Sequence, residues 1–138
     1  MKYVFDASVG LQCLLVEKDT AKARKLRDDF NNDLIELIAP DVFPVEVLNA
    51  LTKAERQKRI TPQDGALLAQ DFMDGLPVLY ASLALLPRAY ELSSKTRAAV
   101  YDCLYVALAE RENCQLVTAD EKLIKNLPGH PIVSLDSL

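Results

Sequence analysis

The sequence predicts an α/β fold, a three-layer α/β/α sandwich around a central, mostly parallel sheet. Short apolar runs alternate along the chain with longer stretches in which apolar residues recur every three or four positions. Strands that alternate with helices form parallel sheets that are covered on both faces. This pattern fills all 138 residues without a linker or an internal repeat, so we expect a single domain over 1–138.

The first half of the chain is expected to hold two strands, over 2–6 and 34–39, and four helices, over 7–16, 20–31, 41–59 and 61–75. Pro40 should end the second strand. Asp41 is the expected N-cap of the third helix, with Pro44 in its first turn. Thr61 caps the fourth helix, and Gly75 is a natural end for it.

The second half is expected to continue the alternation. We expect strands over 78–80, 115–118 and 131–134, the last at an edge of the sheet. The intervening helices should run over 85–95, 100–112 and 120–126, the last capped by Asp120. These elements complete the three layers.

The composition is that of an ordinary globular protein, with 50% hydrophobic and 26% charged residues. Its three cysteines have no paired spacing, so we expect neither a disulfide framework nor a zinc knuckle. Cys13 and Cys103 lie in apolar runs and should be in the core. The sequence shows no signal peptide and no apolar run long enough to span a bilayer, so we expect a cytoplasmic protein.

Most common catalytic chemistries lack the residues they need here. His130 is the one histidine and stands in a turn-like Pro-Gly segment, which leaves little basis for a zinc site or a nucleophile–histidine pair. The four glycines are too dispersed for a phosphate-binding loop or a dinucleotide fingerprint. Carboxylates are the remaining candidates, and the informative ones interrupt apolar segments.

Two of these acids, Asp6 and Asp120, directly follow strand-like runs. Ligands of open α/β sheets bind at the carboxyl ends of the strands, which is where both residues would lie. Thr118 is two residues before Asp120 and would face the same place. Helix capping is the structural alternative for each acid, and a cap can also serve a metal site.

Two further acids belong to helical segments. Glu46 lies in the apolar segment 42–51, which we expect to be largely buried, and Asn49 shares its helical face. Asp102 is the one charge within 100–109. A hydrogen-bonded Glu46–Asn49 pair, and a favourable interaction of Asp102 with the helix dipole, are the structural alternatives.

The four acids would converge at one end of one sheet. Like charges that are crowded and partly buried raise each other's pKa values unless a cation neutralises them. Mg²⁺ or Mn²⁺ suits such a site, because hard cations prefer oxygen ligands. These ions activate water and stabilise the charge that grows on a phosphodiester, so the pattern predicts a metal-dependent nuclease.

Four segments resemble, in order and spacing, the motifs of PIN-domain nucleases, above all the VapC-type toxins of prokaryotic toxin–antitoxin pairs. They are Val4-Phe-Asp-Ala-Ser8, Glu46-Val-Leu-Asn-Ala-Leu51, Tyr101-Asp-Cys-Leu-Tyr-Val-Ala-Leu-Ala109 and Val117-Thr-Ala-Asp-Glu-Lys-Leu123. The resemblance extends from Lys2 to about Val133. It implies Mg²⁺- or Mn²⁺-dependent cleavage of RNA, a homodimer, and inhibition by a small cognate antitoxin whose chain covers the groove.

The resemblance also implies roles for individual residues. The catalytic and metal-binding acids would be Asp6, Glu46, Asp102 and Asp120, with Asp6 and Asp102 the surest metal ligands. Hydrogen bonds that orient water or ligands would come from Ser8, Asn49 and Thr118.

The net charge of −4 argues against strong RNA binding, because phosphates attract Lys and Arg. Metal ions at the scissile phosphate would answer part of this objection. Two basic stretches would hold the RNA backbone, or would simply be solvated helix faces: Lys53, Arg56, Lys58 and Arg59, and Lys22, Arg24, Lys25 and Arg27. We favour the first, because it follows Glu46 on the same helix.

Two other functions remain open. A PIN-like module can bind metal or RNA, or take part in RNA processing, without being a toxin. A phosphoryl-transfer domain with Asp6 as nucleophile is the second alternative. One such pattern has another Asp two residues later, where this chain has Ser8, which argues against it.

Overall fold

The computed structural model describes residues 1–15 and 20–138, and Val16, the expected end of the first helix, lies outside them. The described strands form one sheet in the order β3-β2-β1-β4-β5. Their bounds are Lys2–Phe5 for β1, Glu36–Pro40 for β2, Val78–Tyr80 for β3, Gln115–Thr118 for β4 and Ile132–Ser134 for β5. Every strand pair is parallel, and the last strand is at an edge, as expected.

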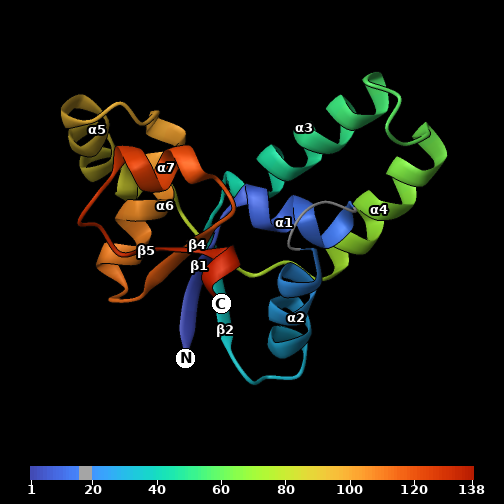
Figure 1. Cartoon of the computed structure of the whole chain (residues 1–138), viewed down its shortest axis with the longest axis horizontal. Helices are drawn as coiled ribbons and strands as arrows, with labels where there is room; N and C mark the ends of the chain where they lie inside the picture. Colours follow the sequence, from blue (N-terminus) through green and yellow to red (C-terminus); the bar gives the residue numbers. More distant parts are fainter. Residues whose placement is uncertain (16–19) are drawn as a thin grey trace.

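Helices cover both faces of the sheet, which confirms the three-layer α/β/α class. Figure 1 places α5 and α6 on one side and α1 and α2 on the other, while α3 and α4 form a hairpin that extends beyond the sheet. The helices are α1 Ala7–Leu14, α2 Thr20–Asn31, α3 Phe43–Arg56, α4 Pro62–Asp74, α5 Leu86–Lys95, α6 Val100–Arg111 and α7 Glu121–Asn126, with 3₁₀ turns η1 Leu83–Leu85 and η2 Leu135–Ser137. In the described ranges, no helix is long and apolar enough to cross a membrane.

The centre of the core lies between the sheet and α6. This helix contacts β1, β2 and β4, and it is buried continuously from Cys103 to Ala109. A helix that is apolar on all sides belongs in the interior, which explains why the segment lacks an amphipathic pattern. Cys13 and Cys103 are both buried, as expected, and all three cysteines are free thiols.

The strand order reverses at β1 and β4. The chain first adds β2 and β3 on one side of β1, then crosses to its other side for β4 and β5. The ends of β1 and β4 lie side by side, with Phe5 in register with Val117 and the Asp6 backbone N–H donating to the Val117 carbonyl at 3.4 Å. This reversal of strand order is where open parallel sheets bind ligands.

The structure corrects the start and the end of α3. Asp41 is not its cap: Val42 takes the cap position without a side-chain bond, and the Asp41 carboxylate accepts hydrogen bonds from the backbone N–H and hydroxyl of Ser82. The helix ends at Arg56 rather than at 59, since Lys58 turns the chain with φ of 59°.

Two sequence predictions for the starts of α3 and α4 are confirmed. Pro44 lies in the first turn of α3, where a missing N–H costs nothing. Thr61 caps α4 by accepting from the backbone N–H of Asp64 at 3.1 Å.

Candidate active site

Asp6 joins β1 to α1 and is the most buried of the four acids, at 6% exposed. Its Oδ1 accepts the backbone N–H of Val9 at 3.2 Å and so caps α1. The same oxygen accepts the Ser8 hydroxyl at 2.5 Å, and Oδ2 accepts the Thr118 hydroxyl at 2.6 Å. Asp6 is therefore a cap and, at the same time, a carboxylate fixed at the carboxyl end of the central strand.

Ser8 and Thr118 link the turn after β1 to the turn after β4. Thr118 is fully buried and accepts the backbone N–H of Asp120 at 3.0 Å. The Ser8 oxygen accepts the N–H of Ala119, also at 3.0 Å. The two hydroxyls thus hold both turns and orient Asp6 between them, and their expected role in orienting water or metal ligands stays a prediction.

The acids interact with one another through space. Burial is the main cause that raises the pKa of Asp6, to about 6, and the Asp102 carboxylate adds to this effect. Burial also raises the pKa of Asp102, with a further contribution from Asp120. The pKa of Glu46 is raised by burial and by the charges of Asp102 and Asp6. The structure therefore brings acids from β1, α3, α6 and the β4–α7 turn into one electrostatic group.

Glu46 has a partner that the sequence analysis missed. The Tyr105 hydroxyl donates to its Oε1 at 2.9 Å, from a ring that is only 2% exposed. Two signals were present: Tyr105 shares a helical face with Asp102, and a buried tyrosine hydroxyl needs a hydrogen-bond partner. This bond joins α3 to α6 and fixes the Glu46 carboxylate.

One expectation about these residues is wrong, and the structural alternative of a Glu46–Asn49 pair is not observed. The segment 42–51 is not largely buried, since Val45 is 68% exposed and Asn49 is exposed, and Glu46 itself is half-buried. In the described part of the chain, the Asn49 side chain makes no hydrogen bond with Glu46 or any other group. Only one stripe of α3 packs on the core, Phe43, Val47, Leu51 and Ala54, and Asn49 is off it.

Asp120 lies at the rim of the group. It is exposed, and its Oδ1 accepts the backbone N–H of Lys122 at 3.0 Å, so it caps α7 as the structural alternative proposed. Its charge still raises the pKa of Asp102. Asp120 can therefore contribute to the field of the site from its edge.

The donor set fits a hydrated Mg²⁺ or Mn²⁺ and does not fit an ion caged by all four acids. Within 1–15 and 20–138, no three Asp, Glu, His or Cys side chains are arranged to hold a metal by themselves. In the same ranges, no Lys, Arg or His is among the main causes that act on the raised pKa values of Asp6, Glu46 and Asp102. Mg²⁺ commonly uses one or two carboxylates and keeps several waters, and this arrangement matches the site.

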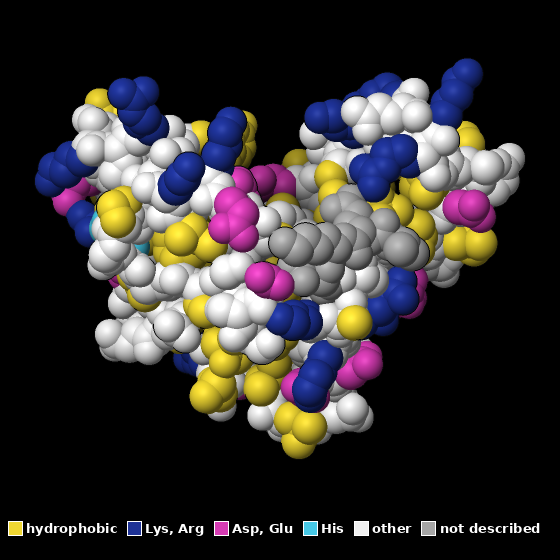
Figure 2. Space-filling view, viewed as in Figure 1, with side chains coloured by type: hydrophobic (Ala, Val, Ile, Leu, Met, Phe, Trp, Pro, Cys, Tyr) yellow, Lys and Arg dark blue, Asp and Glu magenta, His cyan; other side chains and the backbone are white. Residues whose placement is uncertain are grey.

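One face of the molecule is hollowed. Figure 2 shows a notch between the α5–α6–α7 side and the α3–α4 hairpin, with acidic side chains at its base and Lys and Arg side chains along both rims. A polyanion approaching this notch would meet positive charge first and acids at the bottom. Cleavage of a phosphodiester at the base of the notch would need a cation to offset the repulsion between carboxylates and phosphate.

The two basic stretches differ in their surroundings. Residues Lys53, Arg56, Lys58 and Arg59 are all exposed at the far end of α3 and the turn after it. In the second stretch, ion pairs hold Lys22 to Asp136, Lys25 to Asp29 and Arg27 to Asp71. Basic groups that are already paired are less available to phosphates, and the exposure of Lys53, Arg56 and Lys58 supports our preference for the first stretch.

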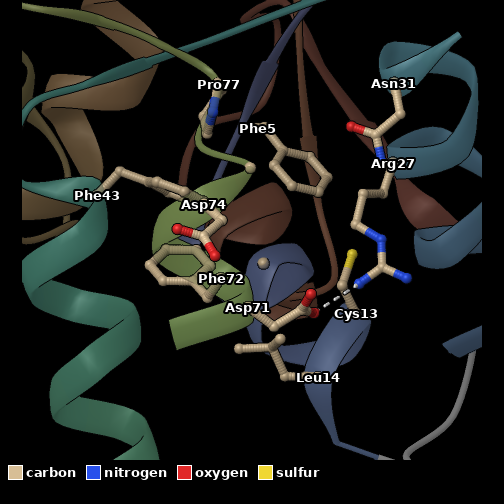
Figure 3. A pocket seen from close by; sticks show the side chains of 12 residues that line it. Phe5, Cys13, Leu14, Arg27, Asn31, Phe43, Asp71, Phe72, Asp74 and Pro77 are labelled. Carbon is tan, nitrogen blue, oxygen red and sulfur yellow. Dashed lines mark ion pairs between the residues drawn. The ribbon is translucent and has the colours of Figure 1, made fainter. Parts of the chain in front are cut away.

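A separate cavity of about 240 Å³ opens between α1, α2 and α4 (Figure 3), and none of the four candidate acids lines it. Phe5, Phe43 and Phe72 line it, and Asp71 at its mouth is paired with Arg27. Burial raises the pKa of the Cys13 thiol to about 11, so this thiol is a poor nucleophile. The acids at the strand ends therefore remain the candidate site.

A parallel α/β/α sandwich with acids gathered at its topological switch point defines the class of the chain, and comparison identifies the family. The PIN domain family model matches residues 3–128. The chain belongs to the PIN-domain family.

Known relatives share much of its length. Ribonuclease VapC12 of Mycobacterium tuberculosis is 34% identical over 129 residues, which cover 92% of each chain. VapC ribonuclease Mb0985 of Mycobacterium bovis is 32% identical over 113 residues, 80% of this chain and 87% of the relative.

Solved structures share the fold. PAE2754 from Pyrobaculum aerophilum aligns over 99% of this chain and 94% of its own, with a TM-score of 0.68 and 20% identity. A chain in the structure of VapBC2 from Rickettsia felis, bound to a DNA fragment from its promoter, aligns over 97% and 98%, with a TM-score of 0.70 and 15% identity. These likenesses confirm the PIN-like sandwich.

Proposed function

We propose that the protein is an endoribonuclease that hydrolyses RNA phosphodiester bonds with the help of Mg²⁺ or Mn²⁺. The observation that carries the proposal is the group formed by Asp6, Glu46 and Asp102 near the carboxyl ends of β1 and β4, whose pKa values are raised first by burial and then by the charge of at least one other acid of the site. Relatives named as ribonucleases support RNA as the substrate.

Each residue has a defined part in this proposal. Asp6 and Asp102 would hold the ion, with Glu46 and Asp120 bonded to its waters or adding charge. The ion supplies positive charge at the phosphate and lowers the pKa of water. Ser8 and Thr118 keep the Asp6 carboxylate in one orientation, and the Tyr105 hydroxyl does the same for Glu46. Asn49 is exposed on the same helix as Glu46, and we assign it at most a contact with RNA or water.

We propose further that the protein is the toxin of a type II toxin–antitoxin pair. The resemblance to VapC proteins supports this role, and the VapBC2 neighbour supports a small protein partner. The antitoxin would cover the notch and thereby exclude RNA. A homodimer and a cytoplasmic location, which we expected from the sequence, stay predictions.

The first prediction tests cleavage itself. Purified protein, free of any partner, should cut members of a broad RNA panel with Mg²⁺ or Mn²⁺, and excess EDTA should stop it. Asp102→Asn should reduce cleavage at least a hundredfold while the metal-free protein stays as stable as wild type or becomes more so, because repulsion is relieved. Asp64→Asn, at an exposed acid in the first turn of α4, is the matched control and should cut normally.

The readout is fragment length on denaturing gels, with urea unfolding of the metal-free proteins as the folding control. If wild type binds RNA and leaves the whole panel intact with either ion, the chain is an RNA-binding module, and the proposed activity is wrong.

A further inference from the structure

The cavity between α1, α2 and α4 has an aromatic wall. Three phenylalanines from three elements line it, Phe5 of β1, Phe43 of α3 and Phe72 of α4. The ring centroids of Phe5 and Phe43 are 5.9 Å apart, and those of Phe43 and Phe72 are 5.6 Å apart, both in tilted contacts. Such a cluster favours a further aromatic ring, because tilted and offset ring contacts are attractive.

The mouth of the cavity is polar, and one of its charges has no counterpart. Arg27 and Asp71 form an ion pair there, with 3.9 Å between Nη1 and Oδ2, so these two charges offset each other. Figure 3 shows Asp74 on the side of the Phe43 and Phe72 rings, away from Arg27, and no ion pair reaches Asp74 within the described residues. Because Asp74 is also exposed, its charge attracts a cation to the mouth.

The size and the thiol of the cavity define how a ligand binds. Its volume of about 240 Å³ exceeds the roughly 150 Å³ in which an apolar cavity holds benzene, so one ring with a short chain fits. The Cys13 thiol donates to the Ala23 carbonyl at 3.3 Å, and burial raises its pKa to about 11. A thiol that stays protonated is a poor nucleophile, so binding is non-covalent.

We propose that this cavity is a binding site for a small aromatic amine, with its ring against the three phenylalanines and its ammonium group at Asp74. Sites for small molecules combine a mostly apolar wall with a few polar groups that fix orientation, and this cavity has both. None of the four acids at the strand ends lines it. The inference is therefore independent of the proposed nuclease function.

The alternative occupant is an aromatic carboxylate held by Arg27. Such a ligand would have to displace Asp71 from the guanidinium and place its own charge at a mouth that also carries Asp74. Two acids against one cation disfavour a further anion. We therefore commit to the amine, and binding of the acid is an outcome of the test.

The experiment is a titration followed by two-dimensional NMR of isotope-labelled protein, in EDTA and without RNA. The probes are 2-phenylethylamine, 2-phenylethanol and phenylacetate, which share a ring and differ in charge. The amine should bind with a Kd on the order of 0.1–1 mM. The alcohol should bind about threefold more weakly, and the acid about tenfold or more. Shifts should concentrate on the backbone amides of Gly10, Cys13, Asp74 and Gly75, which line the cavity.

Variants separate the charge from the cavity. Asp74→Asn should weaken amine binding about threefold and leave the alcohol unchanged. Asp64→Asn is the matched control, since Asp64 is another exposed acid of α4 and does not line this cavity, and it should bind the amine like wild type. Cys13→Met should fill the cavity and abolish binding of both probes, with urea unfolding as the check of its fold.

Three results would overturn the inference. One is no saturable shift at the cavity with the amine at 10 mM, about ten times the weakest expected Kd. The second is tighter binding of phenylacetate than of the amine, which would assign the mouth to Arg27. The third is amine-induced shifts confined to Asp6, Asp102 and Asp120, which would place the cation at the strand ends instead. Each result leaves RNA cleavage untouched, because the titration contains neither RNA nor a divalent ion.

Discussion

At the scale of single residues, the site depends on hydroxyl groups as much as on acids. Thr118 donates to Asp6 at 2.6 Å and accepts the Asp120 N–H at 3.0 Å, and it is completely buried. These bonds oppose the effect of burial on the pKa of Asp6 and so favour its charged form. A buried carboxylate without such donors would hold its proton more tightly and bind a metal less well.

Thr118→Val keeps the shape of the side chain and removes both bonds. We expect the free energy of unfolding to fall by about 1–3 kcal/mol, the cost of leaving buried polar groups unpaired. Thr118→Ser keeps the hydroxyl, so its free energy of unfolding should fall clearly less than that of Thr118→Val. Urea denaturation of the metal-free proteins measures both values, and equal losses in the two variants would contradict the assigned role of the hydroxyl.

Sequence reasoning at this scale found acids and missed their contacts. Asp6 and Asp102 stand out because a charge in an apolar run is unusual. Tyr105 does not stand out, because aromatic residues are ordinary in a buried helix and its partner Glu46 is 59 positions away. Asn49 was misplaced because the apolar letters around it suggested burial on all sides, while α3 packs along a single stripe.

At the scale of elements, the site depends on how closely α1 approaches α3. Gly10 permits this approach: a Cβ there would lie 2.8 Å from Cζ of Phe43 and 3.1 Å from Cγ2 of Val47. The two helices carry Asp6, as the cap of α1, and Glu46. The separation of α1 from α3 therefore affects the distance between the Asp6 and Glu46 carboxylates.

Gly10→Ala should destabilise the protein, although alanine is the better helix former. Overpacking costs about 1–3 kcal/mol, against a gain of about 1 kcal/mol in helix propensity. We expect a net loss of about 1 kcal/mol in thermal or urea unfolding. Gly75→Ala is the control, because nothing lies within 4 Å of its Cβ position. An unchanged stability of Gly10→Ala would show that α1 and α3 can separate freely.

Element boundaries were predictable where a local signal decides them. Thr61 and Pro62 begin α4 as expected, since the cap bond and the proline act within one turn. The prediction that Asp41 caps α3 was wrong, because a residue distant in sequence, Ser82, binds its carboxylate. Apart from the edge position of the last strand, the order of the strands was not readable, since which strands become neighbours depends on crossovers rather than on any one segment.

At the scale of the whole molecule, an acidic chain must still attract RNA. The net charge is −4, yet Lys and Arg line both rims of the notch (Figure 2). Association with a polyanion depends on the local distribution of charge more than on the total. The exposed cations of α3, unlike those of α2, are the ones we expect to contact phosphates.

Salt dependence tests this assignment. Replacing Lys53 and Arg56 by Gln should lower the slope of log Kd against log salt by about 0.7 for each lost phosphate contact with a single strand. Replacing Arg24 and Lys25 by Gln should leave the slope unchanged, because Arg24 donates to the Cys13 carbonyl and Lys25 pairs with Asp29. Identical slopes for wild type and the α3 variant would remove this helix from the RNA path.

The central claim is that coupled, buried carboxylates form a site for a divalent cation, and calorimetric titration of Mn²⁺ into the RNA-free protein tests it most directly. We predict saturable binding to wild type, at least tenfold weaker binding to Asp6→Asn and Asp102→Asn, and unchanged binding to Asp64→Asn. The melting temperature of wild type should rise with Mn²⁺ much more than that of the first two variants. Equal Mn²⁺ affinity in all four proteins would contradict the account.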